Sequence, residues 1–293
     1  MVGETVVNIF KYLGSSGLPI LGIVLVAVWI GKLVRDVLTR YRIDEELTDK
    51  NNAAVGLALA GYYIGLAIAI SGVVTGPESD TLGADLISVG VYSLIAIVLL
   101  NISALINDKL ILYKFNNQNE LVNDKNSGTG ATMAGSYLAT GLIVNAAVSG
   151  EVAGGWVKGL IACLVFFALG QVVLVLAGLW YQLITKYDIH KVIGEDNNVA
   201  AGVGFGGFLF AMGYVLRAAM TGESVSWSVD LISFALYVAI ALILLTIGRL
   251  ITDKIFLPKA KISDEIGGQG NIAAASIAAA IYIAIAVLIV SAV

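Results

Sequence analysis

Two stretches, Asn51-Asn52-Ala53-Ala54 and Asn197-Asn198-Val199-Ala200, decide the fold because they are copies of each other, 146 residues apart. The match continues on both sides, at an offset of 145 from Asp85 onward. A register kept this long indicates an internal duplication, which fixes the architecture before any single motif does. The other matched pairs are Asp85-Leu86-Ile87-Ser88 with Asp230-Leu231-Ile232-Ser233, Ile106-Asn107-Asp108-Lys109 with Ile251-Thr252-Asp253-Lys254, Glu120 with Glu265, and Asn126 with Asn271.

Composition predicts a membrane protein. Hydrophobic residues make up 58% of the 293 residues, charged residues make up 13%, and the mean hydropathy is +0.91. Soluble domains are usually about one quarter charged. Roughly 20 apolar residues of helix cross a bilayer, and lipid leaves no other way to satisfy the backbone of such runs. Eight runs qualify: Leu18–Thr39, Asn52–Val74, Ala84–Leu112, Ala131–Val148, Trp156–Ile184, Val199–Met220, Ser228–Leu257 and Ile272–Ala292.

The predicted fold is therefore an all-α, polytopic membrane bundle of eight transmembrane helices. It is built from two four-helix repeats, residues 1–150 and 151–293. An even number of spans per repeat makes the copies parallel, related by an axis along the membrane normal. The positive-inside rule places the loops after the odd spans in the cytoplasm and both termini outside. Those loops and helix ends carry 14 of the 17 basic residues, namely Lys32, Arg35, Arg40, Arg42, Lys50, Lys109, Lys114, Lys125, Lys186, Lys191, Arg249, Lys254, Lys259 and Lys261.

The outer side is acidic. An acidic mouth raises the local cation concentration and favours a cation pathway. The alternative is that outer loops exclude lysine and arginine and stay soluble through carboxylates alone. The acidic residues concerned are Glu4, Glu78, Asp80, Asp85, Glu151, Glu223 and Asp230.

Several kinds of site are not expected. Cys163 is the single cysteine, so no disulfide framework or paired-cysteine metal site is predicted. His190 is the single histidine and is expected to be a solvated loop residue. The glycines at 202–207 resemble a phosphate loop, but they lie inside a predicted span with no preceding strand. We therefore expect no enzymatic activity, no cofactor, no bound metal and no nucleic-acid partner.

The glycines have a structural explanation instead. Small residues at helical spacing let helices approach closely in lipid, where packing drives association. Gly202, Gly206 and Gly213 form such a row in the sixth span, and Gly56, Ala60, Gly61 and Gly65 form one in the second. Alanines 273–275 and 278–280 add another in the eighth span. The second, sixth and eighth spans are therefore expected to form a tight interior core.

The duplicated polar residues are candidate functional positions. Asp85 and Asp230 open the third and seventh spans, where a helix dipole favours an acid. If they lie below the headgroups, they are candidates for a cation or proton site, because intramembrane carboxylates are costly and usually functional. Asparagine is a preferred helix cap, and Asn52, Asn198, Asn126 and Asn271 stand at helix entries.

Other polar residues leave two explanations open. Asp108 with Lys109 and Asp253 with Lys254 close the third and seventh spans, where an ion pair or a lipid-phosphate contact is the simpler explanation. Polar residues within spans can form interhelical hydrogen bonds or line a polar path. These are Asn101, Asn107, Asn145, Gln171 and Thr246.

These motifs resemble a known family. Four spans per copy, asparagine at the entry of the second and fourth, an Asp-Lys pair closing the third and Glu120 or Glu265 before the fourth are similar to the YjfL-like bacterial inner-membrane proteins, domain-of-unknown-function family 350. The resemblance covers the whole chain as two tandem copies. The copies differ where Asn126-Ser127-Gly128-Thr129-Gly130 faces Asn271-Ile272-Ala273-Ala274-Ala275. The resemblance implies residence in the bacterial cytoplasmic membrane and supplies no catalytic residues.

Two functional hypotheses follow. In the first, the repeats surround a polar path for cations or small polar solutes, with Asp85 and Asp230 at its mouth. In the second, the protein is a non-conducting scaffold that binds anionic lipid or a peripheral cytoplasmic protein through its cytoplasmic loops. The resemblance implies phage-shock-like membrane stress as the setting of that second role. Lipid is the expected partner in both cases, and the chain could also pair as a homodimer.

Overall fold

The computed structural model describes residues 5, 10, 11, 13–74, 81–149, 156–221 and 226–292. Within these residues eight helices are long and apolar enough to cross a membrane, and every regular element is helical, as predicted. The long helices are α2 (Leu18–Leu38), α3 (Ala53–Val74), α4 (Leu82–Ile106), α6 (Ser127–Ser149), α7 (Trp156–Ile184), α8 (Val199–Met220), α9 (Trp227–Ile251) and α10 (Ile272–Ala292).

Shorter elements connect or extend these helices. A π-helical turn, η1 (Leu13–Gly17), precedes α2, and a short helix, α5 (Asn117–Val122), precedes α6. The remaining π-helical turns lie at one end of the bundle: η2 (Glu45–Asp49), η3 (Asn107–Ile111), η4 (Lys191–Glu195), η5 (Thr252–Phe256) and η6 (Asp264–Gly268). We call this end, where α2, α4, α7 and α9 finish, the basic end.

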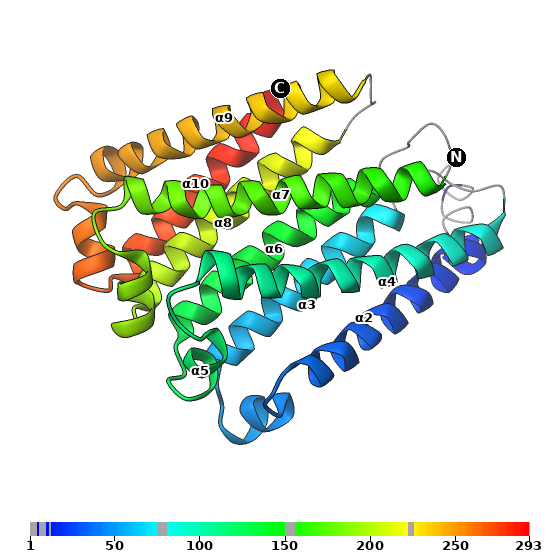
Figure 1. Ribbon diagram of the computed structural model, residues 1–293, viewed down its shortest axis with the longest axis horizontal. Coiled ribbons are helices and arrows are strands. Elements are labelled where there is room, and N and C mark those ends of the chain that lie inside the picture. The colour runs from blue at the N-terminus through cyan, green and yellow to red at the C-terminus, as the bar shows by residue number, and fades with distance from the viewer. Residues whose placement is uncertain are drawn as a thin grey trace.

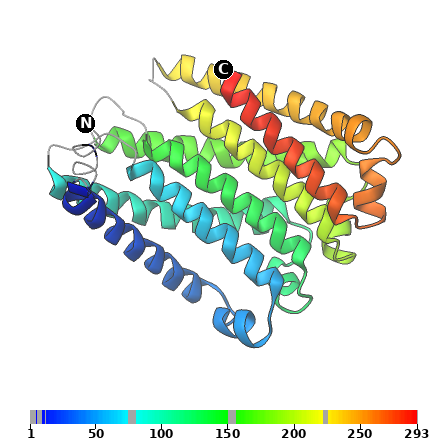
Figure 2. The same ribbon diagram turned by 180° about the vertical axis from the view of Figure 1, so that it is seen from behind.

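The long helices form two rows (Figures 1 and 2). The outer row is α2, α4, α7 and α9, and the inner row is α3, α6, α8 and α10. Each outer helix turns at the basic end into the inner helix that follows it, so the chain is a series of helical hairpins. Helices α4, α7 and α9 each contact two inner helices, their own and the preceding one. The outer row therefore lies over the seams of the inner row.

The hairpin is a finer repeat than the predicted four-helix copy. Asn52, Asn126, Asn198 and Asn271 precede the four inner helices and recur every 72 to 74 residues. The residue before each of them, whether Asn51, Lys125, Asn197 or Gly270, has a φ between 47° and 63°. A non-glycine residue rarely adopts this left-handed conformation. Its recurrence at four matching positions shows that all four hairpins share one turn geometry.

Small residues bring the inner helices into backbone contact. A Cβ added at Gly61 would overlap Ala134 of α6, one at Gly135 would overlap the backbone of Gly206 in α8, and one at Gly207 would overlap Ala279 of α10. Packing this close is the main source of helix association in lipid. The expectation of a core made of the second, sixth and eighth spans was incomplete. The fourth span, α6, lies between α3 and α8 and is the most buried of the eight.

Candidate functional site at the basic end

A cavity of about 740 Å³ opens at the basic end of the first half, lined by residues of α2, α4, α5 and α6 and the loops beside them. One wall carries Leu94, Val98 and Leu105 of α4, whose side chains are also exposed on the surface of the bundle. Because α4 is a spanning helix, this wall borders the hydrocarbon region. The polar lining residues are Arg35, Arg40, Tyr41, Asn101, Asp108, Lys109, Asn116, Asn117, Gln118 and Tyr137, with Thr39 at the end of α2.

Arg35 is the central charge of this cavity. The last turn of α2 presents it, and the residue is only 8% exposed. Its guanidinium carbon lies 5.0 Å from the ring centroid of Tyr62 and 5.8 Å from that of Tyr137. Its Nε is buried without a hydrogen-bond partner, and among the described residues no ion pair includes Arg35. Two cation–π contacts compensate a buried charge only in part, so the site favours an incoming anion.

Two further polar groups beside Arg35 are also unsatisfied. Asn101 donates from Nδ2 to the Tyr62 hydroxyl at 3.0 Å and to the Ile97 carbonyl at 2.8 Å, which leaves its Oδ1 without a partner. The Tyr137 hydroxyl is likewise buried without a partner. Native structures satisfy most buried polar groups. Several unmet groups around one cavity therefore make it a candidate site for a polar molecule.

The second half holds the same kind of cluster with its arginine hydrogen-bonded, although the Tyr181 and Tyr187 hydroxyls there are also buried without a partner. The position that matches Arg35 is Tyr181, and the position that matches Arg249 is Ala104. Arg249 donates to the Ser263 hydroxyl at 2.6 Å and to the Tyr282 hydroxyl at 3.4 Å. Tyr181 packs on Phe205 at 5.1 Å between ring centroids. The cation thus comes from α9 instead of the first helix of the half, and it is hydrogen-bonded within the protein.

The two predicted cation-site aspartates lie elsewhere. Asp85 and Asp230 stand half-buried in the first turns of α4 and α9, at the end of the bundle opposite the cavity. Thr81 and Ser226 cap these helices by accepting from Ala84 and Val229. Among the described residues no cluster of three or more metal-binding side chains forms. The other acidic residues predicted for this end, Glu4, Glu78, Asp80, Glu151 and Glu223, lie outside the described residues.

Most predicted in-span polar residues form hydrogen bonds between helices. Asn107 Oδ1 accepts from Ser136 at 2.5 Å, Gln171 donates to Thr140 at 3.3 Å, and Thr246 accepts from Trp180 at 3.0 Å. Asn145 donates to the Ile68 carbonyl at 2.8 Å and to Ser71 at 3.1 Å, and accepts from Arg217 at 2.7 Å. Of the five, only Asn101 lines the cavity.

The predicted Asp-Lys pairs do not form ion pairs with each other in the described structure. Asp108 and Lys109 both line the cavity, and Asp108 accepts from Asn117 Nδ2 at 2.7 Å. Asp253 instead accepts from the Ile262 backbone N–H at 2.6 Å, and Lys254 is exposed. Lys254, the counterpart of Lys109, is therefore not a residue of this cavity.

The helix-entry asparagines link the hairpins as well as capping them. Asn52, Asn126, Asn198 and Asn271 each accept a hydrogen bond at Oδ1 from a backbone N–H of the following turn. Each of the first three also donates from Nδ2 to a backbone carbonyl of the next hairpin, at Leu121, Ile193 and Ile266, over 2.6 to 2.8 Å. Three of the four donate to a glutamate six residues earlier, namely Glu46, Glu120 and Glu265.

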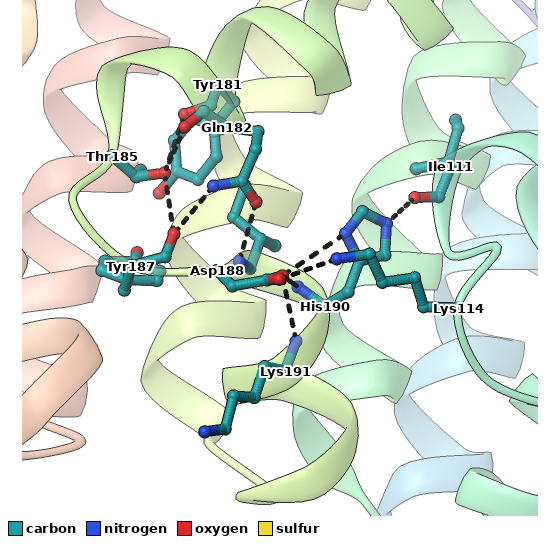
Figure 3. A network of polar contacts seen from close by, with 10 residues as sticks. Ile111, Lys114, Tyr181, Gln182, Thr185, Tyr187, Asp188, His190 and Lys191 are labelled. Atoms are coloured by element: carbon teal, nitrogen blue, oxygen red, sulfur yellow. Dashed lines mark hydrogen bonds and ion pairs between the residues drawn. The ribbon is translucent and has the colours of Figure 1, made fainter.

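A polar network joins the two halves at the basic end (Figure 3). Lys114 forms an ion pair with Asp188 at 2.7 Å, and the same carboxylate accepts from the backbone N–H groups of His190 and Lys191. His190 Nε2 donates to the Ile111 carbonyl at 2.9 Å. The expectation of a solvated histidine was wrong, because His190 is buried against Tyr113 and Phe115. That burial lowers the pKa of His190.

Sequence reasoning missed the importance of Arg35, which it counted only as a basic residue at a helix end. A usable signal was present. When the two halves are aligned, Arg35 is matched by Tyr181 and Ala104 is matched by Arg249. The second half has therefore lost a cation from one helix of the cluster and gained one on another. Such a compensated exchange indicates that the two positions lie near one another in the fold.

Comparisons with known proteins agree with the duplication. The family model described as Domain of Unknown Function (DUF350) matches residues 12–148 and again residues 155–293. A UPF0719 transmembrane protein of Aquifex aeolicus (strain VF5) is 25% identical over 268 residues, which cover 90% of this chain and 96% of that protein. No solved structure matches this chain.

Proposed function

Because both halves match its model, the chain belongs to the DUF350 family, and we propose that it binds an anionic membrane lipid at the basic end of its first half. The protein is a multi-pass membrane protein of an uncharacterised family. The observation that carries the proposal is Arg35, a buried cation with an unpartnered Nε in a cavity of about 740 Å³.

The cavity has the amphiphilic character that a lipid requires. Its α4 wall is apolar and continuous with the exposed surface of a spanning helix. Arg40 and Lys109 add two cations to Arg35, against the single carboxylate of Asp108. Arginine is well suited to bind phosphate, because its planar fork can donate two hydrogen bonds to one anion. An anionic headgroup would lie beside Arg35 and its acyl chains along α4.

We assign this binding to a non-catalytic scaffold in the bacterial cytoplasmic membrane, with the basic end in the cytoplasm. The positive-inside distribution supports the orientation. The cytoplasmic leaflet is also where anionic headgroups attract basic segments. A lipid held between α2, α4 and α6 would couple the lipid composition of the membrane to the conformation of the loops that a peripheral partner binds.

The alternative, a cation path with Asp85 and Asp230 at its mouth, receives less support. Both aspartates lie at helix starts at the end of the bundle opposite the cavity, and the inner row of helices packs backbone against backbone. Cation flux into proteoliposomes tests this alternative directly. Flux that disappears in an Asp85→Asn/Asp230→Asn double variant would establish the path and displace the scaffold role.

Photo-cross-linking tests the lipid proposal. Membranes containing the protein would receive phosphatidylglycerol or phosphatidylethanolamine with a photoactivatable acyl chain, and labelled peptides would be mapped. The proposal predicts that phosphatidylglycerol labels α4 near Leu105 above its labelling of α9, and that Arg35→Met removes the excess. Equal labelling by both lipids, or an excess that survives Arg35→Met, would contradict it. Competition by inorganic phosphate would show whether the site selects the headgroup alone.

A further inference from the structure

The three junctions within the inner row repeat one contact in one register. Gly61 of α3, Gly135 of α6 and Gly207 of α8 occupy matching positions, counted from the asparagine that precedes each helix. Each packs on the next helix, at Ala134, Gly206 and Ala279 respectively. These three contacted residues also occupy matching positions in their own helices, because Ala134 directly precedes Gly135, Gly206 precedes Gly207, and Ala279 precedes Ala280. The inner row is therefore an array in which every junction joins the same two surfaces. We call the surface centred on Gly61, Gly135 or Gly207 the head, and the surface of the next helix centred on Ala134, Gly206 or Ala279 the tail.

Both ends of this array are open. The matching head position on α10 is Ala280, and the matching tail position on α3 is Ala60; both are exposed. Small residues continue along the two faces at the same spacing, with Ala273 and Ala284 on α10 and Ala67 on α3. The unpaired face of α10 thus has the shape that α3, α6 and α8 present to their next neighbours. The unpaired face of α3 has the shape that those neighbours present in return.

The loops at the basic end are open in the same way. Leu121, Ile193 and Ile266 accept the hydrogen bonds from the preceding hairpins, and each of these side chains is at most 2% exposed. The matching residue of the first hairpin is Leu47, which is 41% exposed although it lies in a polar loop beyond the spanning segment. The matching donor at the other end is Asn271, whose side-chain amide donates to Glu265 within its own hairpin at 2.7 Å.

We propose that copies of this chain assemble head to tail, with α10 of one copy packed against α3 of the next. Ala280 of one copy would lie on Ala60 of its neighbour, and Asn271 would donate to the Leu47 carbonyl while that leucine becomes buried. The new junction continues the interface that the chain forms three times internally. A lipid would cover the apolar faces, but it would not supply the hydrogen bond and the burial that the matching loop residues have at the internal junctions and that Leu47 lacks. The interface is heterologous, so it generates a ring or an open row of copies in the membrane plane.

The outer row fits this arrangement. Helices α4, α7 and α9 each contact their own inner helix and the preceding one, whereas α2 has no preceding inner helix in its chain. Many of its large apolar side chains are exposed accordingly, including Leu25, Trp29 and Val37. In the assembly α2 would contact α10 of the preceding copy. The inference does not depend on lipid binding at Arg35.

Cysteine cross-linking in native membranes tests the proposal in a Cys163→Ala background. The double variant Ala60→Cys/Ala280→Cys is expected to form a ladder of disulfide-linked multimers on oxidation. Each single variant alone is expected to stay monomeric, and co-expression of the two singles with different tags should give mixed dimers only. The pair Lys114→Cys/Asp188→Cys, which joins two exposed residues within one chain, is the control for oxidation and folding.

Two outcomes would overturn the proposal. Dimers formed by either single variant would show a two-fold interface instead of a head-to-tail one. A monomeric double variant in membranes where the control pair closes would show that the faces do not meet. A separate measurement uses Leu47→Cys and a water-soluble maleimide. Assembly predicts slow labelling that Ala280→Leu speeds at least tenfold, and equal rates in both backgrounds would contradict it.

Discussion

The first and second halves of this protein build the same kind of tyrosine cluster around one arginine, but Arg35 of the first half lines a large cavity, whereas Arg249 of the second half is hydrogen-bonded to its neighbours. In the first half α2 supplies Arg35 and α4 has the small Ala104, and a cavity of about 740 Å³ remains. In the second half Tyr181 fills the place of Arg35, and Arg249 replaces the alanine and bonds to Ser263 and Tyr282. If the first half binds lipid as proposed, the comparison teaches that a duplicated fold can keep the charge of this cluster while one copy uses it for binding and the other for packing.

Removing the tyrosine that fills the second half should produce the largest effect. Tyr181→Ala deletes a fully buried ring that packs on Phe205 and Phe208. Such truncations of large aromatic residues cost about 3–5 kcal/mol. We expect a fall of this size in unfolding free energy, measured by denaturant titration in detergent micelles. A cost below that of Arg35→Met would show that the second cluster is not the packed one.

The two arginines should differ in their effect on stability. Arg249→Met leaves the hydroxyls of Ser263 and Tyr282 without their partner, a loss of about 1–3 kcal/mol. Arg35→Met removes a guanidinium whose Nε has no partner, so the unfolding free energy should change little. Thermal unfolding of both variants in the same detergent measures this difference in stability. Equal destabilisation by the two substitutions would contradict the assignment of binding to one half and packing to the other.

Filling the open cluster should abolish binding without unfolding the protein. Ala104→Leu adds three carbon atoms at the cavity wall, at the position where the second half carries Arg249. Retention of phosphatidylglycerol through purification, measured by lipid mass spectrometry, should fall at least tenfold, while the melting temperature stays within a few degrees. Leu183→Ala on the exposed surface of α7 is the control. Unchanged retention in Ala104→Leu would place the lipid elsewhere.

The smallest expected effect concerns pH at the basic end. His190 is buried, whereas its counterpart in the first half, Asp44, is exposed. Burial lowers the pKa of His190; the hydrogen bond to the Ile111 carbonyl and the charge of Asp188 oppose that shift, and Lys114 adds to it. Below about pH 6.5 the unfolded chain binds a proton that the folded chain does not, so stability falls as the pH falls. Between pH 7.5 and 5.5 the melting temperature of the wild type should fall more than that of His190→Gln. An equal fall in the two proteins would contradict this.

The sequence predicts the helices well because eight long apolar runs and one duplication are strong signals. The fourth helix begins at Ser127 instead of Ala131 because Asn126 caps it, and polar residues in its first turn hid that start. The small and polar residues from Gly128 to Thr132 also made the central position of this helix in the inner row hard to predict. α6 has inner neighbours on both sides and needs small residues facing each of them.

The candidate site was harder to predict. Asp85 and Asp230 attract attention because charge in an apolar run is rare, but each lies at a helix start. Arg35 looks like one more basic residue at a helix end, and only the packing of Tyr62 and Tyr137 shows it to be buried. Burial depends on side chains more than 25 residues away in the sequence, and local pattern carries no information about them.

Lipid retention by the two arginine variants tests the central claim most directly. Native mass spectrometry would count phosphatidylglycerol bound to wild type, Arg35→Met and Arg249→Met, each purified from the same membranes. The account predicts that Arg35→Met loses one bound lipid per chain and that folded Arg249→Met keeps it. Retention by Arg35→Met, or an equal loss in both variants, would contradict a binding site built around Arg35.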